Sequence, residues 1–207
     1  MKKIFSSNVD INKNAYLNWR MNRHSDSNNF FTMAESFSNS TFILLDSILN
    51  DNTDKKADSI IFPILYSADH SIELYLKAII IKIHNDNQSE EKLKITHDID
   101  KLFEKAKELI NKYYDNNVES LNEALSNLES YITELYSYIV KPDDKKKKPQ
   151  MDFARYPLDT KNNDYFYVKS FDNVVVDIEN FKNRFENITD SLESVYYYLE
   201  EKYEVQN

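Results

Sequence analysis

The sequence contains no glycine and no cysteine in its 207 residues. Glycine-rich loops bring backbone N–H groups close to phosphates, so the absence of glycine excludes the P-loop, the dinucleotide-binding fingerprint and the glycine-flanked nucleophile elbow. The absence of cysteine excludes disulfides, thiolate nucleophiles, iron–sulfur sites and cysteine-based zinc sites. Only four histidines are present and no HExxH pattern occurs. We therefore expect neither a dedicated metal site nor a cofactor.

Long apolar runs are also missing. No stretch approaches the roughly 20 apolar residues of a membrane span, and the first residues lack an apolar run of signal-peptide length. The net charge of -9, from 26 basic and 35 acidic residues, disfavours a chain that coats nucleic acid with a basic surface. These features predict a soluble cytoplasmic protein that has no membrane partner.

The composition is that of one folded domain. Hydrophobic residues make up 41% of the chain and aromatic residues 14%, enough for a sizeable core, and the length is near the upper end for a single core. We expect one domain over residues 1–207, with an N-terminal extension at 1–27 and a long loop at 141–170.

Apolar residues recur at alternating spacings of three and four, which is typical of amphipathic helices. The pattern continues from Val118 to Ile139 and predicts one long helix that ends before Pro142 and is capped by Asn116 or Asn117. Further helices are predicted over about residues 30–48, 59–84 and 98–113 and from about residue 172. The fold class is therefore all-α, an up-and-down bundle of about five helices with one long loop. An intermolecular coiled coil is the less favoured alternative, because the connections are short.

The long loop contains three of the four prolines. It opens with a lysine-rich run between Pro142 and Pro149, and blocks of like charge usually stay solvated and extended. The alternative function for this run is a flap that attracts anions. The segment from Asp164 to Phe171 alternates weakly between polar and apolar residues, as an extended segment lying against the bundle would.

A narrow polar stripe marks the otherwise apolar helix at 59–84. At about 100° per residue, five polar side chains project within roughly 60° of one another. They are Tyr66, His70, Glu73, Lys77 and His84. Glu73 and Lys77 form an i, i+4 pair in the favourable order. The stripe is either a self-satisfied polar seam in the core or a functional site, because buried charges are a weak route to stability.

A second candidate is the Thr96-His97-Asp98 segment at the start of a predicted helix. Thr96 or Asp98 can cap the helix, but capping does not require His97. A His-Asp doublet in a helical protein also invites comparison with HD-type metal phosphohydrolases, which need further ligands on separate helices. The sequence shows no clear second signature of that class.

A third candidate is Arg155 in the long loop, followed by Tyr156 and Pro157. The guanidinium group is planar, always charged and suited to binding phosphate, and the X-Pro sequence favours an extended backbone just after it. The structural alternative is that Arg155 anchors the loop to a carboxylate of a helix, such as Glu73. We expect His70, Glu73 and Lys77 to share one polar pocket with His97 and Arg155.

Taken together, three segments resemble the HEPN superfamily of helical bundles. They read FPILYSADHSIELYLKAIII, then THDIDKLFEKA, then FARYPLD before the last amphipathic helix. The similarity spans about residues 60–199. HEPN proteins occur in toxin–antitoxin, abortive-infection and CRISPR-linked systems, so the resemblance implies a role in prokaryotic or phage conflict such as antiphage defence.

The resemblance also implies metal-independent RNA cleavage in a homodimer. HEPN ribonucleases carry an Arg and a His with four to six residues between them, and these residues meet across a dimer. This sequence departs from that pattern, because Arg20 and His24 are separated by three residues and no His follows Arg155. The departure leaves the existence of nuclease activity open.

Two functions follow from these features. In the first, the protein acts on RNA as a metal-independent endoribonuclease with a divergent motif. Arg155, His97 and His70 would then be catalytic, while Glu73, Lys77 and Tyr156 bind substrate. In the second, the bundle is a non-catalytic module that binds a partner protein, such as an antitoxin, or a nucleotide.

Overall fold

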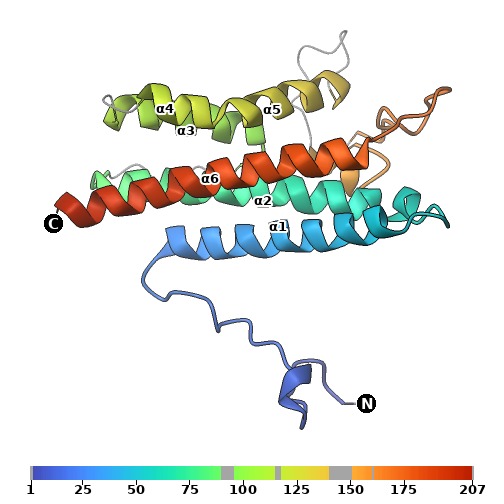
Figure 1. Cartoon of the computed structure of the whole chain (residues 1–207), viewed down its shortest axis with the longest axis horizontal. Coiled ribbons are helices and arrows are strands. Elements are labelled where there is room, and N and C mark those ends of the chain that lie inside the picture. The colour runs from blue at the N-terminus through green and yellow to red at the C-terminus, as the bar shows by residue number, and fades with distance from the viewer. Residues whose placement is uncertain (1, 90–95, 115–117, 140–150, 160, 207) are drawn as a thin grey trace.

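The computed structural model describes residues 2–89, 96–114, 118–139, 151–159 and 161–206 (Figure 1). Within these residues the chain forms six α-helices and no strand, which confirms the predicted all-α class. Their bounds are α1 (Asp26–Asn50), α2 (Ala57–Asp86), α3 (Ile99–Tyr113), α4 (Val118–Ala124), α5 (Ser126–Ile139) and α6 (Ile178–Gln206). Short 3-10 helices are present as η1 (Ile11–Lys13) and η3 (Met151–Ala154).

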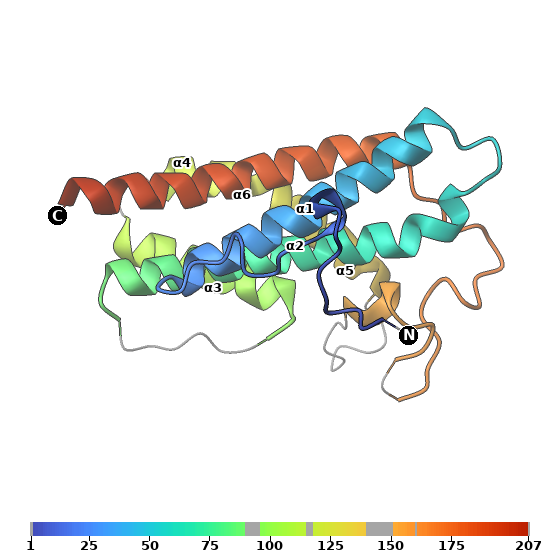
Figure 2. The same cartoon turned by 90° about the horizontal axis from the view of Figure 1, so that it is seen from below.

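Helix α2 is the central element of the bundle. It packs against α1, α3 and α6 and also meets η3, and every residue from Ser71 to Ile80 is buried. This burial explains why the α2 sequence is apolar on most of its circumference. Figures 1 and 2 show α1, α2 and α6 running side by side, with α4 and α5 along the edge opposite α1. Polar side chains on α2 therefore lie inside the bundle or at its edge.

The prediction of a single long helix before Pro142 is wrong in one respect. The chain is helical on both sides of Leu125, but α4 ends at Ala124 and α5 begins at Ser126. Ser126 and Asn127 follow the break, and both belong to the residue types whose side chains can compete for backbone hydrogen bonds and so disfavour a helix interior. The apolar seam continues across it, because Leu121, Leu125 and Leu128 are all buried. The residues proposed to cap the long helix, Asn116 and Asn117, lie outside the described residues.

The C-terminal helix begins later than the sequence pattern indicated. Residues 172–177 are non-helical, and α6 starts at Ile178. The side chain of Asp177 accepts a hydrogen bond from the backbone N–H of Asn180 at 3.0 Å, as an N-cap does. Three β-branched residues, Val174 to Val176, precede this cap and favour extended backbone.

The described part of the long loop packs partly against the bundle. Phe153 and Tyr165 are buried, and they form a small apolar cluster with Leu65 of α2 and Leu135 of α5. The lysine-rich run predicted as a solvated loop or an anion-attracting flap lies outside the described residues. In the part of the chain that is described, no helix has the length and apolar character needed to span a membrane.

Candidate functional site

The centre of the candidate site is the carboxylate of Glu73 on α2. Its side chain is buried, with 8% of its surface exposed, and three basic side chains surround it. Lys77 donates a hydrogen bond to Oε1 at 2.6 Å, and His97 Nδ1 lies 3.0 Å from the same oxygen. His70 Nδ1 lies 3.7 Å from Oε2. The structure thus brings together four of the residues expected in one pocket.

The electrostatics of this cluster hold Glu73 in its charged form. Burial by itself raises the pKa of the carboxyl, but the nearby His70 ring, the hydrogen bond from Lys77 and the charges of Lys77 and His97 outweigh it. The result is a pKa of about 2, below the ordinary value of 4.5. Glu73 is therefore a fixed negative charge that orients the surrounding cations, and it does not itself exchange a proton near neutral pH.

His97 is positioned by the start of α3. Asp98 is the N-cap of α3 and accepts a hydrogen bond from the backbone N–H of Lys101. The hydroxyl of Tyr136 on α5 donates to the same side chain at 2.8 Å. The Thr96 hydroxyl accepts a hydrogen bond from the Asp98 N–H at 3.2 Å. The cap is therefore tied to α5, and it places His97 at the edge of the bundle with 77% of its side chain exposed.

An aromatic chain extends the site toward the long loop. Tyr66, one turn before His70 on α2, lies parallel to the His70 ring with the centroids 5.7 Å apart. Phe37 of α1 meets His70 edge-on at 4.5 Å. The guanidinium carbon of Arg155 lies 5.3 Å from the centre of the Tyr66 ring and 5.2 Å from that of Tyr156.

Arg155 does not contact Glu73 directly, contrary to the structural alternative considered for it. It instead pairs with Asp152, three residues earlier in η3, at 3.2 Å. The turn formed by η3 brings the two side chains together, because the backbone N–H of Arg155 also bonds to the Asp152 carbonyl at 2.8 Å. The link from Arg155 to Glu73 runs through the rings of Tyr66 and His70. Arg155 and Tyr156 are both exposed and open to a ligand.

The remaining member of the predicted stripe is His84. It is buried near the C-terminal end of α2, about two helical turns beyond Lys77. The polar stripe therefore divides into a part that surrounds Glu73 and a part near the C-terminal end of α2.

A buried acidic group next to the site was not identified from the sequence. Asp69 is 4% exposed, and one of its carboxylate oxygens accepts a hydrogen bond from Tyr131 of α5 at 2.6 Å. The other oxygen has no partner among the described residues. Burial raises the pKa of Asp69 to about 7, although the hydrogen bond from Tyr131 partly offsets this effect. The sequence signal that could have identified Asp69 is its position as an acidic residue within an apolar helix, directly before His70.

The donor set around Glu73 suits acid–base chemistry and phosphate binding. An imidazole whose Nδ1 faces a carboxylate presents its Nε2 to a substrate, which is the arrangement of an oriented general base. Arg155 provides a permanent cation beside two aromatic rings. Among the described residues, no group of three or more His, Asp or Glu side chains is arranged to hold a metal ion. The comparison with metal phosphohydrolases thus finds no ligand set in that part of the chain.

Comparison with protein-family models, with curated proteins and with solved structures finds no match for this chain.

Proposed function

We propose that the protein is a HEPN-like conflict protein that acts on RNA through the site centred on Glu73. The observation that supports this proposal most strongly is the buried Glu73 carboxylate, which holds His97, His70 and Lys77 around a single point. If the cluster were only a structural polar seam, one counter-ion for Glu73, such as Lys77, would be enough. The two further imidazoles, one of them largely exposed, are what acid–base catalysis requires.

The proposed reaction is transfer of the RNA phosphodiester to the neighbouring 2′-hydroxyl. His97 takes the proton of the 2′-hydroxyl as its oxygen attacks phosphorus, and the bond from phosphorus to the 5′-oxygen breaks. Protonated His70 donates a proton to the departing 5′-oxygen. The products are a 2′,3′-cyclic phosphate and a free 5′-hydroxyl, so atoms and charges balance without a cofactor.

Arg155 has the electrostatic role in this proposal. The developing phosphorane carries extra negative charge, and a preorganised cation stabilises it more strongly than it stabilises the ground state. Arg155 is exposed, and its contacts with Tyr66 and Tyr156 restrict its orientation. Tyr156 can stack on a base or a ribose next to the bound phosphate. In a toxin–antitoxin setting, a partner protein would act by covering this exposed side of the bundle.

The test is incubation of the purified protein with total RNA and with tRNA in EDTA. Wild type should cleave at least one of them, and His97→Ala and Arg155→Ala should lose cleavage while their circular dichroism is unchanged. His24→Ala is the matched control, because His24 is an exposed histidine outside the site. Loss of cleavage in His24→Ala with full activity in His97→Ala would contradict the proposed site.

Binding without cleavage is the outcome that would replace this function with the non-catalytic alternative. If wild type leaves all RNA intact but binds nucleotide or RNA, and Arg155→Ala abolishes that binding, the site is a ligand-binding module. Arg155→Lys distinguishes the planar fork from the charge alone, because lysine retains the positive charge and loses the bidentate geometry.

A further inference from the structure

The N-terminal arm, residues 2–24, is exposed at every position except Asn14, which is half-buried. None of its residues is buried, although eight of them are large and apolar. Their exposed fractions are Ile4 94%, Phe5 88%, Val9 104%, Ile11 69%, Tyr16 53%, Leu17 79%, Trp19 80% and Met21 38%. Isolated exposed apolar residues are ordinary, but eight of them along one segment, five of which line the same cleft, indicate an interaction surface.

The shape of the arm is fixed by its own hydrogen bonds. Asn29 of α1 accepts from the Asn22 N–H at 2.7 Å and donates to the Asn22 carbonyl at 2.8 Å, which sets the direction in which the arm leaves the helix. Asn8 and Asn14 make a similar reciprocal pair at 2.7 and 3.1 Å. These two pairs hold the backbone of the arm at Asn8 and at Asn22, while its large apolar side chains stay exposed.

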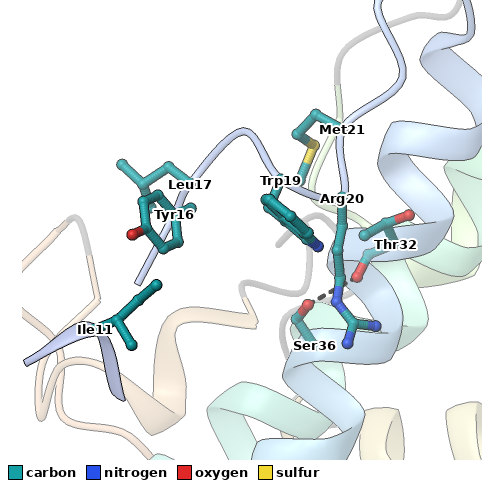
Figure 3. Close-up of a pocket in the computed structure, with 8 residues that line it drawn as sticks. All are labelled: Ile11, Tyr16, Leu17, Trp19, Arg20, Met21, Thr32 and Ser36. Atoms are coloured by element: carbon teal, nitrogen blue, oxygen red, sulfur yellow. Dashed lines mark hydrogen bonds between the residues drawn. The ribbon is translucent and has the colours of Figure 1, made fainter. Parts of the chain in front are cut away.

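A cleft separates the arm from α1. Figure 1 shows the arm on the side of α1 that faces away from the other helices, and Figure 2 shows it running back along α1. The cleft has a volume of about 490 Å³. In Figure 3, the Arg20 side chain of the arm lies beside Thr32 and Ser36 of α1 with Trp19 next to it, while Tyr16 lies farther from α1, near Ile11 and Leu17.

The α1 wall of the cleft continues along the outer face of the helix. Met33, Ser36, Ser40 and Ile43 follow the spacing of one helix face and are all exposed, Met33 by 40% and Ile43 by 69%. This face and the arm form the two sides of an angle that is open to solvent.

The charges of the arm and of the remaining chain are opposite in sign. The arm carries five basic residues and one acidic residue, a net charge of +4, which leaves -13 on the rest of the chain. Helix α1 itself carries Asp26, Glu35 and Asp46 and no basic residue, so the α1 of a second copy is opposite in charge to the arm. Single-stranded RNA would also be attracted, but bases stack on aromatic rings, and five of the eight exposed apolar residues of the arm are aliphatic or methionine. These side chains fit a protein surface.

The available area is sufficient for a stable dimer. With roughly 100–150 Å² for each large side chain, eight of them offer on the order of 1,000 Å² from one protomer, and a symmetric pair of arms doubles this contribution. Specific interfaces bury about 1,200–2,000 Å² in total. A two-fold axis satisfies both copies at once, because the arm of each contacts the α1 face of the other.

We propose that the cleft between the N-terminal arm and α1 is occupied by the α1 outer face of a second copy, so that two chains exchange arms in a homodimer. The exchange buries Leu17 and Trp19 against Met33 and Ile43 of the other copy. This interface is independent of the RNA chemistry proposed above, because none of its residues contacts the cluster around Glu73.

Size-exclusion chromatography with light scattering tests the dimer. Wild type should run at twice 24.6 kDa, and Trp19→Ser should weaken the dimer about 30-fold, as loss of a central aromatic anchor does. The matched control is Phe171→Ser, which removes an exposed aromatic ring, 107% exposed, from outside the arm. A wild-type monomer at high micromolar concentration, or a Trp19→Ser dimer as stable as wild type, would overturn the proposal.

Disulfide trapping tests the exchange itself and is free of background because the chain has no cysteine. Leu17→Cys protein is mixed with differently tagged Ser40→Cys protein under mild oxidation. We expect a covalent species that contains one copy of each. A Leu17→Cys/Ser40→Cys double variant that forms only an intramolecular disulfide would show that the arm folds onto its own α1, and would refute exchange. A monomeric protein whose arm variants lose RNA binding would reassign the arm to RNA.

Discussion

The buried carboxyl of Asp69 makes the stability of this protein depend on pH in a defined direction. In the folded chain, burial raises the pKa of Asp69 from its ordinary value of 3.8 to about 7. Between these two values the folded state keeps a proton that the unfolded state has released. The free energy of unfolding therefore falls as pH rises through this window, by about 1.4 kcal/mol per pH unit for this single group.

Replacement of Asp69 by asparagine should remove this dependence. The asparagine side chain is neutral at every pH, and its oxygen can still accept the hydrogen bond that Tyr131 donates. Between about pH 5 and pH 8, the stability of Asp69→Asn relative to wild type should rise by roughly 3 kcal/mol. Other titrating groups are common to both proteins, so they cancel in this difference.

The assay is urea denaturation followed by circular dichroism at several pH values between about 5 and 8. Asp58→Asn is the matched control, because Asp58 lies exposed in the first turn of α2, and its stability relative to wild type should stay nearly constant. Tyr131→Phe removes a hydrogen bond that lowers the folded-state pKa of Asp69, so the decline in stability should still begin near the unfolded-state pKa but should continue to a higher pH than in wild type. Equal pH slopes for wild type and Asp69→Asn would refute this reasoning.

Three further outcomes are expected. Lys77→Met should lower the free energy of unfolding by about 3 kcal/mol in urea denaturation, because it leaves the buried Glu73 without its closest cation. Because the folded-state pKa of Glu73 is about 2, the stabilisation that its charged carboxylate provides should be complete above about pH 4.5 and be lost as pH falls toward 2. In Glu73→Gln, the free energy of unfolding should therefore change less with pH over this range than it does in wild type. Tyr136→Phe should lower activity more than stability, because it loosens the Asp98 cap that positions His97, and kinetics alongside denaturation will separate the two effects.

The sequence was sufficient to predict the helical class and the central role of α2. The three-and-four spacing fixes which face of each helix is buried, and the apolar character of residues 59–84 requires contacts on most sides. The break at Leu125 was not predicted, because the apolar seam crosses it unchanged and only the polar pair after it signals the interruption. The start of α6 was placed too early because apolar periodicity does not exclude the three valines before the Asp177 cap from a helix.

The candidate site was predicted in part for similar physical reasons. Helical geometry alone puts His70, Glu73 and Lys77 on one stripe, and His97 joins them because its helix packs on α2. The partner of Arg155 was not predictable, because it depends on the 3-10 turn that brings Asp152 next to it. Asp69 precedes His70 and therefore points to a different side of α2 from the stripe. Its burial could not be predicted, because it depends on the packing of α5, whose Tyr131 donates a hydrogen bond to it.

The central claim is that the cluster around Glu73 cleaves RNA with histidines as acid and base. Its most direct test is the chemistry of the RNA ends left after incubation in EDTA. We predict new 2′,3′-cyclic phosphate and 5′-hydroxyl ends with wild type and with His24→Ala, and none with His97→Ala. Undiminished formation of these ends by His97→Ala, or no new ends with any tested RNA, would contradict the claim.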